Sequence, residues 1–328
     1  MDEVLLESAT KPSQDTRTRS PNMCLATLAV TAAGAGAQTV TFTMFNDVDF
    51  VNFWYCRSTV DVNMELWMTV CLSTMLVVGS QLPVPLPTSP AARILMIVTF
   101  VITAGLLVAT FFIIPATSQS GNPAWEIGWV LGVVGLACIA QAICGQLVYG
   151  YLGSSTPQSG NFVGVAQSGG TIGFFVSFVI RALSKWAVDE TPDLQKLNCT
   201  ALNSTQFEAL AGQFRISGAL YGGLMAAVTL LGMIGMLLLY KIRWPKDNDS
   251  ELVSKHHSVA GSVDNSRCGI YKRLAAPLVT VFMVLAMTLS LFPGLISQLH
   301  PAALRGQSGW FIVIAFGFFQ LETLGGSC

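Results

Sequence analysis

The chain has 328 residues, of which 52% are hydrophobic and only 11% are charged, whereas a soluble domain carries about 25% charged residues. So few charges cannot cover a water-facing surface, and the composition therefore predicts that much of the surface faces lipid. The formal net charge of −1 excludes the strongly basic surface of a nucleic-acid binder, so no nucleic-acid partner is expected.

Long apolar runs follow the polar residues 1–22 along most of the chain. A bilayer core requires roughly 20 apolar residues as helix, and because backbone groups in lipid must be hydrogen-bonded internally, each run is expected to be a helix. The first run is too long for the core of a signal peptide, and we read it as an uncleaved span. The sequence thus predicts an all-α polytopic membrane protein with about eight spans, near 23–45, 66–84, 92–115, 125–151, 161–184, 215–241, 274–297 and 309–325.

The distribution of Lys and Arg predicts the topology. Positive charges gather in the tail 1–22 and in the polar linker 242–273, which places both in the cytoplasm and divides a six-helix bundle, 23–241, from the segment 274–328. The loop between the fifth and sixth spans then faces outward and holds two glycosylation acceptors, Asn198 and Asn203. Cys56 and Cys199 share that oxidising side, where they either form a disulfide or remain free thiols. We expect the plasma membrane as the location.

Enzymatic signatures are missing from the sequence. It contains no phosphate-binding glycine loop, no nucleophile elbow and no zinc-ligand spacing of Cys and His. We therefore expect no enzyme, no cofactor and no metal site, and a transport process driven by gradients rather than by ATP.

Polar side chains inside the spans are the main functional signal, because they are costly in lipid and tend to face a cavity or another helix. Gln167 and Thr171 share one face of the fifth span at i,i+4 spacing. Such groups either bind a neutral solute rich in hydroxyls and ring nitrogens or hydrogen-bond neighbouring helices. The remaining candidates lie in the fourth and eighth spans: Gln141, Gln146, Gln320 and Glu322.

Glycine and proline mark places of close packing or bending. Gly169 and Gly173 form a G-x-x-x-G step, which lets two helices approach closely. Pro293, next to Phe292, removes a hydrogen bond and is expected to kink the seventh span.

Three segments resemble the equilibrative nucleoside transporter family. They are "GQLVYGYLGSSTPQSGNFVGVAQSGGTIGFFVSF" at 145–178, "LFPGL" at 291–295 and "GWFIVIAFGFFQLETLGG" at 309–326. The resemblance covers about residues 30–326 and includes the order of the segments and the polar linker after six helices. The chain departs from the family where Glu322 replaces an Asp and Gly326 replaces an Arg.

The resemblance implies a major-facilitator-like bundle of eleven helices, of which this chain would supply eight and would be truncated at its C-terminus. It also implies alternating-access transport of nucleosides or nucleobases, either facilitative or proton-coupled. Gln146 would then contact the base and Glu322 the ribose, an aromatic side chain such as Trp67 or Phe174 would stack on the ring, and Phe292 and Pro293 would serve gating or structure. A transport-inactive truncated protein and a polytopic receptor remain the alternatives.

Overall fold

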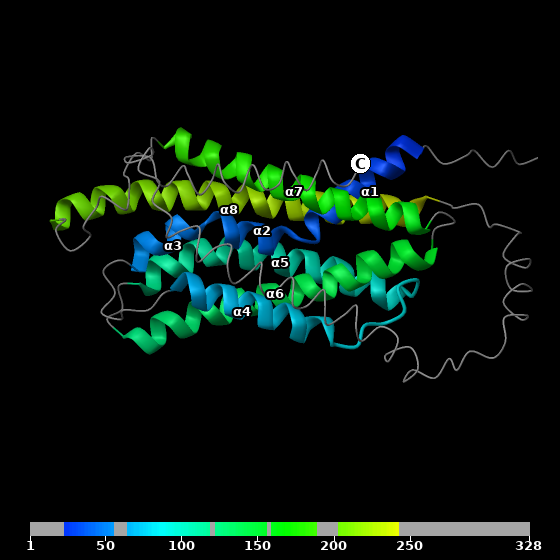
Figure 1. Ribbon diagram of the computed structural model, residues 1–328, viewed down its shortest axis with the longest axis horizontal. Coiled ribbons are helices and arrows are strands. Elements are labelled where there is room, and N and C mark those ends of the chain that lie inside the picture. Colours follow the sequence, from blue (N-terminus) through cyan, green and yellow to red (C-terminus); the bar gives the residue numbers. More distant parts are fainter. Residues whose placement is uncertain (1–22, 56–63, 119–121, 156–158, 189–202, 243–328) are drawn as a thin grey trace, which may run out of the picture.

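The structure is a computed structural model that describes residues 23–55, 64–118, 122–155, 159–188 and 203–242, and these form an elongated bundle of helices (Figure 1). The last two expected spans, the linker and the N-terminal tail lie outside the described residues. The helices are α1 Met23–Gly36, α2 Thr39–Asn46, α3 Val48–Tyr55, α4 Met64–Ser80, α5 Pro90–Thr117, α6 Pro123–Ser155, α7 Ser159–Ala187 and α8 Ser204–Lys241.

Capping residues decide where the long helices begin. The Ser89 side chain accepts a hydrogen bond from the backbone N–H of Ala92 at 3.1 Å, and Pro90 occupies the first turn of α5, where a missing N–H costs nothing. Asn203 forms a capping box with Gln206 at the start of α8. This box starts α8 at Ser204, well before the expected boundary of residue 215.

The bundle is built around contacts of α1, α5 and α6 with their neighbours. α1 packs against α7 and α8, α5 packs against α6 and α8, and α4 packs along α6. Figure 1 shows α7 and α8 together on one side of the bundle and α4 and α6 on the other. α1 is therefore held between two long helices, and its continuation α2 enters the middle of the bundle.

Several helices are candidate membrane spans by their length and composition. Within the described residues, α5, α6, α7 and α8 are long and apolar enough to cross a bilayer, and α1 with α2 makes a fifth span if the bent pair counts as one. The shorter apolar helix α4 has 17 residues. Large apolar side chains point outward along the bundle, as Phe112, Leu136 and Leu231 do. These helices indicate a multi-pass integral membrane protein.

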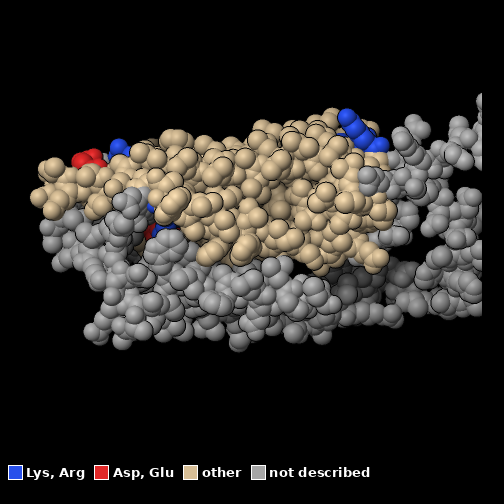
Figure 2. All heavy atoms as spheres, turned by 90° about the horizontal axis from the view of Figure 1, so that it is seen from above, with Lys and Arg blue, Asp and Glu red and all other residues tan. Residues whose placement is uncertain are grey.

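Charged side chains are unevenly placed on one face of the bundle. On the face seen in Figure 2, the Lys, Arg, Asp and Glu atoms of the described residues gather toward the two ends and leave a long uncharged middle. A face without charged side chains over its middle is suited to contact with a hydrocarbon layer there.

Two hydrophobic clusters fill the interior, one on each side of the break between α1 and α2. The first combines α1 with α5, α6, α7 and α8 around Met96, Phe100 and Leu147. The second combines α2 and α3 with α4, α5, α6 and α8 around Phe53, Trp54 and Phe214. The polar side chains described next lie at the level where one cluster gives way to the other.

Candidate functional site

The first expected span is not one straight helix. α1 ends at Gly36, α2 begins at Thr39, and the two axes are bent by 53°. Small residues allow this break to lie against α8, because a Cβ added to Gly36 would stand 2.7 Å from the Cα of Gly232. The sequence alone predicted a continuous helix here, since every residue of the run is compatible with a span.

Gln141 of α6 completes the hydrogen bonding of the broken backbone. Its Oε1 accepts from the backbone N–H of Thr41 at 3.1 Å, and its Nε2 donates to the Thr41 hydroxyl at 2.7 Å. The first N–H groups of a helix have no partner within that helix, so Gln141 acts as a cap supplied by another element. Gln141 lies two residues past the midpoint of α6, or about 3 Å along its axis.

Gln38 makes a second polar pair at the break. Its Nε2 donates to the hydroxyl of Tyr149 at 2.7 Å. Gly170 of α7 leaves the space for this side chain, because a Cβ there would lie 2.8 Å from the Gln38 Oε1. Gln38, Thr41, Gln141 and Tyr149 together are called the polar break below.

Aromatic rings stand beside the polar break. Phe42 of α2 and Phe174 of α7 meet edge to face with ring centroids 5.0 Å apart, and Phe45 packs against them. Phe174, one of the expected stacking residues, is therefore paired with a ring of the first span. Trp67, the other, is about half exposed on α4.

The residues predicted to contact the solute do not lie together in the structure. Gln146 is half-buried and donates to the backbone carbonyl of Gly79 in α4 at 3.2 Å, whereas Gln141, five residues earlier, faces α2. Gln167 is exposed on α7, and the Thr171 hydroxyl donates to its backbone carbonyl at 3.4 Å.

The other predicted residues either pack helices together, cap a helix, or lie outside the described residues. Gly169 and Gly173 both face α1, where added Cβ atoms would meet the backbone of Thr31 and the side chain of Ala35. Asn203 is exposed and caps α8. The residues outside the described ranges are Asn198, Phe292, Pro293, Gln320, Glu322 and the cysteines Cys56 and Cys199.

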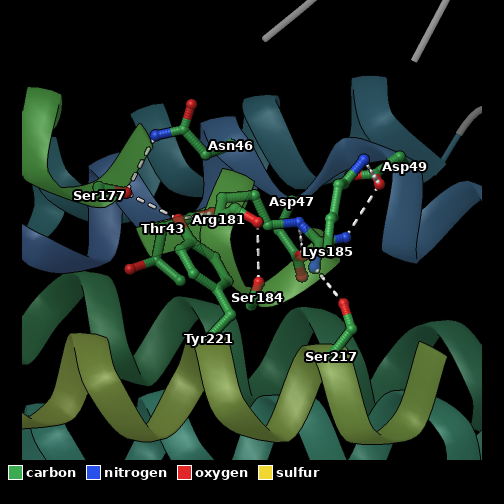
Figure 3. A network of polar contacts seen from close by, with 10 residues as sticks. All are labelled: Thr43, Asn46, Asp47, Asp49, Ser177, Arg181, Ser184, Lys185, Ser217 and Tyr221. Carbon is green, nitrogen blue, oxygen red and sulfur yellow. Dashed lines mark hydrogen bonds and ion pairs between the residues drawn. The ribbon is translucent and has the colours of Figure 1, made fainter. Parts of the chain in front are cut away.

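A buried group of charges lies at the end of α2, and sequence reasoning did not single it out (Figure 3). Arg181 of α7 is fully buried and bonds the carboxylate of Asp49 at 2.9 Å and the hydroxyl of Ser217 at 2.7 Å. Its Nε lies 3.4 Å from Asp47 Oδ1, and Lys185 forms an ion pair with Asp49. Asp47, Asp49, Arg181 and Lys185 are called the charge clamp below.

The charge clamp continues into a chain of neutral hydrogen bonds. Asn46 donates to the Ser177 hydroxyl at 2.9 Å, and that hydroxyl shares a hydrogen bond of 2.7 Å with Tyr221. Figure 3 shows these side chains in one row between α2, α7 and α8. The sequence did offer a signal for this group. Arg181 and Lys185 stand at i,i+4 spacing in the last turns of one apolar run, and Asp47 and Asp49 follow the end of another.

Neither a metal site nor a family match accompanies this arrangement. Among the described residues, no group of three or more His, Cys, Asp or Glu side chains is placed to hold a metal ion. No protein-family model, no curated protein and no solved structure matches the chain. The arrangement of the polar break and the charge clamp therefore carries the functional argument.

Proposed function

We propose that this protein moves a small, neutral, polar solute across a membrane by alternating access. The observation that carries the proposal is the polar break, where the first span is interrupted between Gly36 and Thr39 near the middle of the bundle and polar side chains surround the interruption. Transporters commonly place their solute sites at interrupted helices near the bilayer midplane. Gln141 caps the broken backbone in this state, and an amide at that depth is also able to exchange its hydrogen bonds with a polar solute.

The chemistry of the polar break favours a solute with both donors and acceptors. The Gln38 and Gln141 amides and the Thr41 and Tyr149 hydroxyls each donate and accept, and none of these four side chains carries a formal charge. The adjacent rings of Phe42 and Phe174 offer an apolar face to a planar group. Together with the resemblance, this supports nucleosides or nucleobases as the solute class, carried passively or together with protons.

Solute binding would replace hydrogen bonds that the protein now makes internally. Gln141 bonds Thr41 twice in the described state, so a solute that took one of these bonds would exchange it at small net cost. Gln146, in contrast, stabilises the contact of α6 with α4. We therefore infer that Gln141, rather than Gln146, contacts the solute from α6.

Uptake into vesicles that contain the purified full-length protein tests this proposal. Saturable uptake of a radiolabelled nucleoside or nucleobase is expected, and Gln141→Leu is expected to raise KM by about tenfold, the equivalent of one lost hydrogen bond. Gln146→Leu is the matched control on the same helix and should change KM little. An applied pH gradient separates passive from proton-coupled transport.

Two results would contradict the proposal. Absence of saturable uptake for every purine and pyrimidine tested would favour the transport-inactive alternative. An N-terminal tag that is open to protease on intact cells would contradict the cytoplasmic N-terminus and favour the receptor. A KM that rises only with Gln146→Leu would keep the transporter but return the site to the sequence-based position.

A further inference from the structure

The short helix α2 carries one of the hydroxyls of the polar break, and its orientation has to be fixed from outside. α2 has 8 residues, fewer than an isolated helix needs to be stable. Near its start, the Thr39 hydroxyl shares a hydrogen bond of 2.7 Å with Thr229 of α8. At its end, Asn46 and Asp47 bond to α7.

The end of α2 is held by charge, and that attachment is rigid. The charge clamp contains two carboxylates and two cations, so it is electrically balanced. The side chains of Arg181 and Asp47 are 0% and 4% exposed. Separating buried charges of opposite sign leaves each one without compensation in a dry interior, which is far more costly than stretching a neutral contact. Small displacements of α2 from α7 are therefore strongly resisted.

Arg181 reaches both sides of the joint between α2 and α3. Asp47 is the residue between the two helices, and Asp49 lies in the first turn of α3. The Ser217 hydroxyl and the face of the Tyr221 ring, whose centroid is 5.5 Å from the guanidinium carbon, fix the guanidinium from α8. A Lys at position 181 would keep the charge but could not form this planar set of contacts.

We propose that Arg181 is a positioning residue: by holding Asp47 and Asp49 on the two sides of the joint, it fixes α2 and so places the polar break for the solute. The proposal rests on the proposed transport function. Thr41 lies six residues before Asp47, or about 9 Å along the helix axis. A rotation of α2 that the clamp prevents would move the Thr41 backbone N–H and hydroxyl away from Gln141.

The competing view is that the clamp stabilises the folded bundle and has no effect on the solute. The two views differ in what a folded variant does. Loss of positioning weakens solute binding and raises KM, whereas a purely stabilising clamp lowers the amount of active protein and leaves KM unchanged.

The test uses a variant that removes one charge of each sign. Asp47→Asn with Arg181→Gln keeps the Asp49–Lys185 ion pair and the balance of charge. The matched control, Glu208→Gln with Lys241→Gln, also removes one charge of each sign, from exposed positions on α8. Arg181→Lys is the conservative variant for the case in which the double variant does not fold.

The first readout needs no solute. In full-length protein whose native cysteines are replaced, Phe45→Cys places a thiol at a half-buried position of α2. Its rate of reaction with a water-soluble thiol reagent reports the position of that helix. We expect the double variant to change this rate about tenfold, the size of the coupling between contacting residues. The control pair should not change it.

The second readout is uptake. We expect the double variant to raise KM about tenfold and Arg181→Lys to raise it about threefold, with kcat changed less than KM.

Several outcomes would overturn the proposal. One is a folded double variant whose labelling rate and KM equal those of the wild type. Another is a fall in kcat that matches the loss of folded protein while KM stays constant. If the double variant does not fold, the proposal is overturned when Arg181→Lys shows the wild-type KM and labelling rate. If the wild type transports nothing, the proposed function fails, and the labelling rate still decides whether Arg181 positions α2.

Discussion

Asn203 caps α8 and is also the acceptor of a predicted glycosylation sequon, so its side chain would serve two purposes at the surface of the protein. Its Oδ1 accepts from the backbone N–H of Gln206 at 2.8 Å, while the Gln206 side chain accepts from the Asn203 backbone N–H at 3.3 Å. A glycan attaches to the other amide atom, Nδ2, which the cap does not use. Capping and glycosylation of Asn203-Ser204-Thr205 are therefore compatible.

Substitutions at this sequon separate the two purposes, and we predict different outcomes for them. In an Asn198→Asp background, Asn203→Asp and Thr205→Ala should both abolish the shift in mobility that glycosidase treatment produces. A third variant, Asn203→Ala, should abolish the shift and also destabilise the protein by about 1 kcal/mol. Asp at position 203 keeps the oxygen that caps α8, whereas Ala has no acceptor there. Thermal unfolding of the deglycosylated proteins in detergent measures this difference. A background protein that already lacks the mobility shift would contradict glycosylation at Asn203.

The types of residue at the site were easier to predict than their partners. The amides of the fourth span stand out in the sequence because polar groups are rare in apolar runs, yet Gln141 and Gln146 are equivalent by that criterion. Their partners depend on how α6 is rotated, and this rotation follows from packing against α2 and α4. Arg181 was missed because its position six residues before the end of α7 makes it look like part of a charged helix end.

At the scale of the elements, glycines bring α1 into backbone contact with its two neighbours. A Cβ on Gly169 of α7 would lie 2.8 Å from the Cα of Thr31, and one on Gly232 of α8 would lie 2.7 Å from the Cα of Gly36. Without a hydrophobic force between helices in lipid, such close approach supplies much of the association energy through dispersion. α1 is therefore held by close backbone packing, while α2 is held by hydrogen bonds and charges in addition to its apolar contacts.

Replacing Gly169 with Ala is predicted to separate α1 from α7. The added methyl would overlap the backbone of Thr31, which cannot turn aside as a side chain could, and overpacking of this kind costs about 1 to 3 kcal/mol. Gly164→Ala on the same helix is the matched control, because nothing lies within 4 Å of a Cβ there. It should be neutral or stabilise α7 by up to about 1 kcal/mol. Thermal unfolding in detergent compares the two, and equal melting temperatures would contradict the packing described here.

Helices were predictable as elements, but their interruptions were not. The six expected spans that fall within the described residues are helical, because apolar runs of that length leave the backbone no other partner in lipid. The break at Ala37–Gln38 depends on Gln141 of a distant helix, and the early start of α8 depends on the capping box at Asn203. Both features arise from side-chain hydrogen bonds, which a hydropathy pattern cannot predict.

At the scale of the whole molecule, the ends of the bundle differ in what they carry. The end formed by the last turns of α7 and the first turns of α8 contains Asn203 and the charge clamp. The opposite end contains Met23 and Lys241, the first and last residues of the described helices. Because the segments that adjoin this second end are rich in Lys and Arg, we expect it to lie in the cytoplasm and the first end outside.

Two single cysteines test this orientation directly. Trp186 is 78% exposed near the end of α7, and Lys241 is exposed at the end of α8. Since α8 is long and apolar enough to cross the bilayer once, the two positions should lie on opposite sides. In a background without other cysteines, we expect a membrane-impermeant maleimide to label Trp186→Cys in intact cells and to label Lys241→Cys only after permeabilisation.

The reverse labelling pattern would show the opposite orientation in the membrane. Asn203 would then lie on the side where glycans are not added, and the charge clamp would lie toward the cytoplasm. Labelling of both positions in intact cells would show that α8 does not cross the membrane, which would contradict the arrangement of spans from which the polar break derives its depth.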